Sequence, residues 1–202
     1  KVNDLSPMAE AFRILITNMN FMLPKKKGKV VFVTSTVKGE GKTFVSVNLA
    51  LTLASPSKKT IIIGSDIRNP QLQRYNTARK GLIGLTEYLN DENVKLEEIV
   101  HPSSFNKNLD VIYSGSIPPN PTDLLSNGKY EVLIETLKEK YDYIILDTAP
   151  LMLVTDSFLI SEVADITLYV TRSKYTEKSL IDFANKVMDA GKIKNAAFIL
   201  ND

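Results

Sequence analysis

Short apolar, mostly β-branched runs alternate along this chain with stretches that have helical periodicity. The apolar runs occupy residues 30–33, 60–63, 109–112, 143–146, 166–170 and 197–200. Most of them are continuously apolar, which is typical of strands covered on both faces. This strand–helix–strand alternation predicts an α/β fold with a mostly parallel sheet and helices on both faces.

Two of the intervening stretches show the helical pattern clearly. In the first, apolar side chains recur at positions 130, 133, 134, 137 and 141, with charged residues between them. In the second they recur at positions 180, 184, 187 and 188, and Gly191 is placed to end the helix. Both stretches have the length and spacing expected of helices that cover a sheet.

Composition excludes several classes of protein. The 202 residues contain no cysteine, which excludes disulfide scaffolds, thiolate metal sites and cysteine nucleophiles. A formal net charge of +2 does not indicate a nucleic-acid binder. No apolar run approaches the roughly 18–20 residues that span a bilayer. The hydrophobic fraction of 44% is typical of a globular domain.

The first 28 residues precede the sheet. Ser6 and Pro7 are a favourable helix start, and the helix is expected to reach about Met22. The basic run from Lys25 to Lys29 is interpreted as a solvated linker, with a membrane or partner patch as the alternative. We therefore expect one domain over 1–202, with a helix and linker at 1–28 and a core at 29–202. Because the chain starts at Lys1 and stops just after a strand, we expect it to be a fragment of a longer protein.

The segment at 34–43, Thr-Ser-Thr-Val-Lys-Gly-Glu-Gly-Lys-Thr, follows the first strand and opens a helix. Its glycines allow backbone N–H groups to crowd around a polyphosphate, and the helix adds its positive dipole end. Lys42 can reach the β- and γ-phosphates, and the Thr43 hydroxyl can bind Mg²⁺. The predicted nucleotide-binding residues here are Thr36, Val37, Lys38, Gly39, Glu40, Gly41, Lys42, Thr43 and Phe44. The first of these, Thr36, stands where the usual P-loop pattern has glycine.

Two carboxylates follow strands whose ends should lie beside this loop. Asp147 ends the run 144–146, as a Walker B acid does, and Asp66 follows the run 60–63. Because parallel strands bring their carboxyl ends to one edge of a sheet, both acids are expected near the phosphate loop. A turn or helix cap is the alternative for either acid alone. Together with Thr43 they form the predicted metal site.

Four further residues have open interpretations. Arg172 could contact nucleotide or a neighbouring subunit, or be a surface residue at a helix start. Asn201 could be a turn asparagine, or it could contact adenine, as a resemblance to the wider group of P-loop ATPases implies. Asp156 could lie in the active-site cleft or cap a helix. His101 is interpreted as a loop histidine without a catalytic role.

Several motifs, in order, resemble the bacterial tyrosine kinase (BY-kinase) family, the cytoplasmic catalytic domains of polysaccharide co-polymerases. The resemblance extends from about Asp4 to Asp202. Beyond the phosphate loop and the segment around Asp147, it rests on the segments 6–7, 10–13, 48–50, 66–70, 84–89, 115–121, 124–125 and 155–156. Asp-Ile-Arg-Asn-Pro at 66–70 and Pro-Pro-Asn-Pro at 118–121 are its most specific parts.

The resemblance implies a protein-tyrosine autokinase that uses ATP and Mg²⁺. Its acceptors would be tyrosines in the C-terminal tail of a neighbouring subunit, and it would regulate capsule or exopolysaccharide synthesis and export. Lys42, Asp66 and Asp147 would be the catalytic residues, with Asp66 contacting metal and activating the tyrosine hydroxyl. The domain would lie at the cytoplasmic side of the bacterial inner membrane and work with a membrane activator in the same or another chain.

Three departures from the family pattern bear on this expectation. Gly64 replaces the first acid of the usual Asp-x-Asp in the second Walker motif, which affects catalytic rate or metal stoichiometry. In the helix that the family uses to form rings, Glu10 and Arg13 match, but Ile16 replaces a second arginine and weakens the expected homo-oligomer. The tyrosine-rich tail, if present, lies beyond Asp202.

Two other functional classes are compatible with the sequence. A ParA/MinD-like ATPase switch would transfer the phosphoryl group to water, although its signature lysine position is occupied here by Val37. A catalytically weak nucleotide-binding assembly module would bind Mg·ATP without forming phosphotyrosine, and Gly64 keeps this alternative open.

Overall fold

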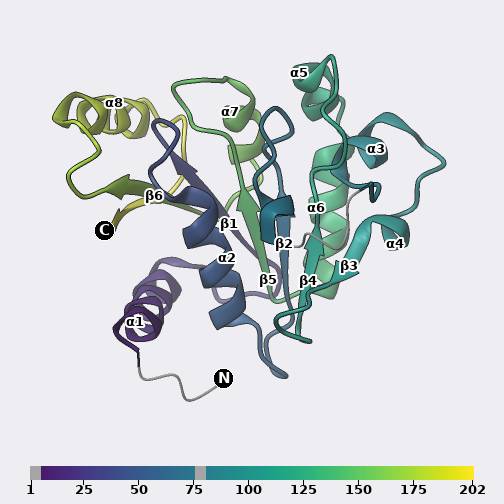
Figure 1. Ribbon diagram of the computed structural model, residues 1–202, viewed down its shortest axis with the longest axis horizontal. Coiled ribbons are helices and arrows are strands. Elements are labelled where there is room, and N and C mark those ends of the chain that lie inside the picture. Colours follow the sequence, from purple (N-terminus) through teal and green to yellow (C-terminus); the bar gives the residue numbers. More distant parts are fainter. Residues whose placement is uncertain (1–5, 76–80) are drawn as a thin grey trace.

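The computed structural model describes residues 6–75 and 81–202, which form a twisted sheet between two layers of helices (Figure 1). The strands are β1 (Lys29–Ser35), β2 (Thr60–Gly64), β3 (Val100–Pro102), β4 (Leu109–Ile112), β5 (Tyr143–Asp147), β6 (Ile166–Arg172) and β7 (Ala196–Asn201). The helices are α1 (Pro7–Met22), α2 (Lys42–Leu53), α3 (Leu85–Asn90), α4 (Leu96–Ile99), α5 (Pro121–Ser126), α6 (Lys129–Lys140), α7 (Asp156–Ser161) and α8 (Lys178–Asp189), with a 3₁₀ turn, η1, at Leu72–Tyr75.

The sheet has the strand order β3-β4-β2-β5-β1-β6-β7. All pairs are parallel except β3 with β4. The predicted α/β fold is thus confirmed, and each predicted strand is present within one or two residues at either end. β3 was not predicted from the sequence, and the interpretation of His101 as a loop residue was wrong. This side chain lies in β3 and stacks against Tyr113.

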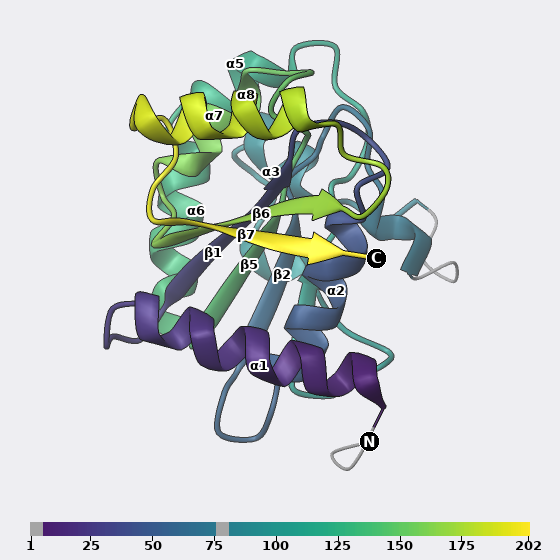
Figure 2. The ribbon, with the colours of Figure 1, turned by 90° about the vertical axis from the view of Figure 1, so that its left-hand side faces the viewer.

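The two faces of the sheet bury separate apolar layers because successive side chains of a strand point to opposite faces. In β1, Val30 and Phe32 pack with the layer under α3 to α8, whereas Val31 and Val33 pack with the layer under α1 and α2. Figure 2 shows α1 crossing the sheet on the side of α2, with α7 and α8 on the other side. This arrangement explains why the strands are continuously apolar.

The N-terminal helix starts as the sequence predicts. The Ser6 side chain accepts a hydrogen bond from the Ala9 amide, and Pro7 occupies the first turn. Within α1, Glu10 pairs with Arg13 at 2.9 Å. In the described part of the chain, no helix is long and apolar enough to cross a membrane.

Candidate active site

The phosphate loop connects the end of β1 to the start of α2, where the strand ends at Ser35 and the helix begins at Lys42. Gly41 caps the helix in the left-handed conformation, with φ of 90°, which favours glycine. The first amides of α2 therefore face the cleft at the carboxyl edge of the sheet. This is the geometry that binds phosphate at a helix N-terminus.

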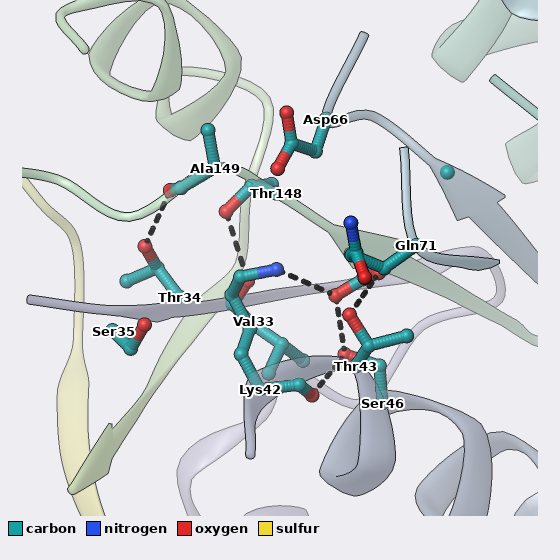
Figure 3. Close-up of polar contacts among 12 residues, drawn as sticks. Val33, Thr34, Ser35, Lys42, Thr43, Ser46, Asp66, Gln71, Thr148 and Ala149 are labelled. Carbon is teal, nitrogen blue, oxygen red and sulfur yellow. Dashed lines mark hydrogen bonds and ion pairs between the residues drawn. The ribbon is translucent and has the colours of Figure 1, made fainter. Parts of the chain in front are cut away.

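Figure 3 shows Lys42, Thr43 and Ser46 of α2 close together, and all three side chains contact Asp147. Lys42 Nζ lies 3.1 Å from Asp147 Oδ1, and the Thr43 hydroxyl donates to Oδ2 at 2.8 Å. Ser46 donates to Oδ1 at 3.2 Å. Ser46 was not predicted as a site residue, although its position four residues after Lys42 places it on the same face of the helix.

Asp66 is brought to Asp147 by the backbone. The amides of Ser65 and Asp66 both donate to the backbone carbonyl of Asp147, at 2.8 and 3.1 Å. Burial raises the pKa of Asp66, and the negative charge of Asp147 acts in the same direction. The Asn69 amide and the Lys42 ammonium act against this shift in the pKa of Asp66. Asp66 lies at the same edge of the sheet as the phosphate loop, and its raised pKa makes it a stronger base than an ordinary aspartate.

A cleft of about 430 Å³ opens between the phosphate loop and the segment after Asp66. Of the predicted binding residues, it is lined by Val37, Lys38, Gly39, Glu40, Gly41, Lys42, Thr43, Phe44 and Asp66. Its opposite wall includes Gln71, Arg74 and Tyr75, which were not predicted from the sequence. These residues carry no motif of their own; Arg74 and Tyr75 lie in the turn η1, and Gln71 lies immediately before it.

Three predicted binding residues, Thr36, Arg172 and Asn201, do not line this cleft. The Thr36 hydroxyl is buried and shares a hydrogen bond with the Tyr169 hydroxyl at 2.6 Å. Arg172 ends β6 and donates to the Gly39 carbonyl, and Asn201 ends β7 and donates to the Glu40 carbonyl. Both lie in strands, not after them as the sequence suggested.

Asp156 neither caps a helix by a side-chain hydrogen bond nor lines the cleft. It is the first residue of α7 and is buried in an ion pair with Arg68, and it also accepts a hydrogen bond from Thr122. This group joins the segment after Asp66 to α5 and α7. It therefore holds the wall of the cleft in place.

The oxygen atoms near the loop fit a magnesium ion better than a metal bound by protein alone. Within residues 6–75 and 81–202, no group of three or more histidine, cysteine or acidic side chains could hold a metal. Mg²⁺ is typically bound by one or two carboxylates together with water and substrate phosphates. The adjacent Thr43 hydroxyl and Asp147 carboxylate, with Asp66 nearby, match that requirement.

Gly64 occupies a position where a side chain has no room. A Cβ built there would lie 2.7 Å from Ser114 Oγ and 3.2 Å from the Ser114 amide nitrogen. The Ser114 hydroxyl also donates to the Gly64 carbonyl at 2.6 Å. Glycine at position 64, where the resemblance leads one to expect an acid, therefore matches the packing of β2 against the segment after β4.

Introducing an aspartate at position 64 should destabilise this protein. We expect Gly64→Asp to lower the melting temperature by several degrees, because overpacking a buried site costs about 1–3 kcal/mol. Adding Ser114→Gly should recover part of the loss by removing the clashing hydroxyl. Thermal unfolding of the two variants measures this, and an unchanged melting temperature in Gly64→Asp would contradict the packing argument.

Comparison with known proteins places this site in context. Residues 28–198 match the family model described as an AAA domain. The chain is 35% identical over 201 residues to the tyrosine-protein kinase CpsD of Streptococcus agalactiae serotype III, covering all of this chain and 85% of that protein. It is 35% identical over 195 residues to the tyrosine-protein kinase YwqD of Bacillus subtilis, covering 96% and 80%.

Solved structures with a similar fold also include a tyrosine kinase domain. The kinase domain of the Escherichia coli tyrosine kinase ETK superimposes with a TM-score of 0.85 at 28% identity, covering 96% of this chain and 74% of that chain. The chimerical protein CapA2B2 gives a TM-score of 0.88 at 30% identity, covering 98% and 86%. The cell-division ATPase MinD of Pyrococcus furiosus, at 22% identity and a TM-score of 0.69, shares the fold.

Proposed function

This chain belongs to the bacterial tyrosine-protein kinases, and on that premise we propose that it transfers the γ-phosphoryl group of ATP to protein tyrosine. One observation carries the proposal. Lys42 and Thr43 of the phosphate loop converge on Asp147, and the basic carboxylate of Asp66 lies at the same edge of the sheet. A ParA/MinD-like switch shares the fold but is less similar in sequence, at 22% identity for MinD.

We assign the roles from the contacts. The Lys42 ammonium exchanges Asp147 for the β- and γ-phosphates when nucleotide enters, while the loop amides hold the phosphate oxygens. Thr43, Asp147 and Asp66 would hold Mg²⁺, which supplies positive charge to the phosphates when bound. The tyrosine oxygen attacks the γ-phosphorus, its proton passes to Asp66, and the bond to the bridging oxygen of ADP breaks.

The biological setting belongs to the same proposal. A relative from Klebsiella pneumoniae is described as a putative tyrosine-protein kinase in the cps region. We propose that this chain regulates capsule or exopolysaccharide synthesis and export from the cytoplasmic side of the inner membrane, with a membrane activator. We also propose a ring of subunits that contact through α1, in which Glu10 and Arg13 exchange their present pairing for contacts between subunits. The acceptors would be tyrosines in a neighbour's C-terminal tail.

The kinase and switch functions are separated by the destination of the phosphoryl group. We would incubate the full-length protein and its membrane activator with γ-labelled Mg·ATP, and then count label on tyrosine and in free phosphate. The kinase proposal predicts label on tyrosine. Release of free phosphate with unlabelled tyrosine would support the switch, and nucleotide binding with neither product would support the assembly module.

The role of Asp147 makes a separate prediction. In Asp147→Asn the neutral amide loses the charge that attracts Mg²⁺, so we expect the Mg²⁺ concentration for half-maximal activity to rise at least about tenfold, since hydrogen bonds and contacts to charged groups contribute about 1.5–3 kcal/mol. A magnesium titration of tyrosine phosphorylation measures this. An unchanged titration curve would remove Asp147 from the metal site.

A further inference from the structure

Glu40 places a negative charge in the loop proposed to bind polyphosphate, where a free carboxylate would repel the ligand. Its side chain is fully buried, and both carboxylate oxygens are occupied. Oε2 accepts the amides of Thr36 and Val37, at 2.8 and 2.9 Å. Oε1 accepts the hydroxyl of Thr176 at 2.5 Å. The charge is therefore satisfied within the protein and fixes the first part of the loop.

The hydroxyl of Thr176 has a defined direction. It accepts the backbone amide of Arg172 at 2.8 Å, so its own proton is left to donate to Glu40. Thr176 lies in the segment that joins β6 to α8, more than 130 residues along the chain from the loop. That segment thus reaches the phosphate loop through a buried, charge-assisted hydrogen bond.

Three consecutive carbonyls of the loop are held from the same side. The Tyr175 hydroxyl donates to the Lys38 carbonyl at 2.8 Å, and Arg172 Nη1 donates to the Gly39 carbonyl at 3.0 Å. Asn201 Nδ2 donates to the Glu40 carbonyl at 3.1 Å. The carboxyl ends of β6 and β7 therefore supply a donor to each carbonyl in turn.

These contacts determine the direction of the amides. In a planar trans peptide, the C=O group and the N–H of the next residue point in opposite directions. Holding the carbonyls of residues 38, 39 and 40 toward β6 and β7 therefore turns the amides of residues 39, 40 and 41 the other way. Amides arranged side by side in this way bind an anion.

We propose that Thr176, Tyr175, Arg172 and Asn201 are positioning residues that pre-form the phosphate loop before nucleotide arrives. They act through the loop on the phosphates and not on the base. This inference rests on nucleotide binding at the loop, which is part of the proposed function. It extends the site to the carboxyl ends of β6 and β7.

The test uses Thr176→Val, with Thr176→Ser as its matched control, and compares two ligands by calorimetry. The ligands are Mg·ATP and Mg·inorganic triphosphate, which has no base. We expect Thr176→Val to weaken the binding of both by about tenfold, because a buried carboxylate oxygen loses its donor. Thr176→Ser retains the hydroxyl and should bind both ligands as the wild type does.

A second variant covers the case in which Thr176→Val fails to fold. Tyr175 is 49% exposed, so Tyr175→Phe removes only a hydroxyl from the surface. This variant should weaken the binding of both ligands by about fivefold with an unchanged melting temperature. The control Tyr88→Phe on α3 should change the binding of neither ligand.

The outcomes separate this inference from the proposed function. Weakened ATP binding with unchanged triphosphate binding would mean that these residues contact the base, and would overturn the inference. Unchanged binding of both ligands in a folded variant would also overturn it. Failure of the wild type to bind either ligand would instead contradict nucleotide binding itself.

Discussion

Lys42→Met should abolish phosphotyrosine formation and weaken Mg·ATP binding at least about 30-fold. The ammonium is the one cation of the loop that points to the buried Asp147, and hydrogen bonds to charged groups contribute about 1.5–3 kcal/mol each. Asp147 keeps the hydroxyl donors Thr43 and Ser46, so the variant should fold. Its melting temperature should nevertheless fall, because a buried carboxylate has lost its counter-ion.

Calorimetric titration with Mg·ATP measures the affinity, and circular dichroism tests the fold. Lys107→Met, which removes an exposed lysine from the loop before β4, is the matched control and should bind as the wild type does. If folded Lys42→Met bound ATP with unchanged affinity, the assignment of the phosphate loop would be wrong.

Asp66→Asn should have the second large effect, a loss of phosphoryl transfer by a factor of about 100 or more with ATP still bound. The neutral amide cannot accept the tyrosine proton, and general-base catalysis contributes about 10²–10⁴-fold. Its oxygen can still accept the Asn69 amide, so the local backbone contact is retained. Rate assays at saturating ATP, with a parallel binding titration, separate the two effects.

The same substitution should make the protein more stable at neutral pH. Burial raises the pKa of Asp66 in the folded state, so the ionised form is less favourable there than in the unfolded chain. The stability that comes from protonated Asp66 is fully present below the pKa that this residue has in the unfolded chain. It is lost as pH rises through the pKa of Asp66 in the folded state. The melting-temperature gain of Asp66→Asn should therefore be present at pH 7 and shrink as pH falls toward the folded pKa.

Asp182→Asn, an exposed carboxylate on α8, should change neither activity nor this pH dependence. Should Asp66→Asn retain full kinase activity, Asp66 would not be the base. A decrease in melting temperature at pH 7 would contradict its unfavourable burial. These two results are independent because one concerns proton transfer and the other the free energy of unfolding.

Most of the sheet could be predicted because its strands are buried on both faces and so have continuous apolar sequences. β3 could not, because it has three residues, ends at Pro102 and lies at the edge of the sheet. Its pairing with β4 is set by the packing of the segment around it, so the sequence shows no hydrophobic periodicity that would predict this strand.

The central site residues were predicted because parallel strands bring their carboxyl ends together. Lys42, Asp66 and Asp147 all follow from that rule and from the phosphate-loop pattern. Thr176 and Tyr175 were not predicted as parts of the loop, because their contacts join segments more than 130 residues apart. The sequence also could not predict that the Glu40 side chain points into the protein, because it shows no evident partner for an acid in this loop.

The most direct test of the kinase assignment separates enzyme from acceptor. Full-length protein carrying Lys42→Met would serve as the acceptor, and wild-type protein lacking its tail, with the membrane activator, as the enzyme. With γ-labelled Mg·ATP, we expect label on tyrosines of the Lys42→Met protein and none when the wild-type enzyme is omitted. Unlabelled tyrosine with release of free phosphate would contradict the account and indicate an ATPase.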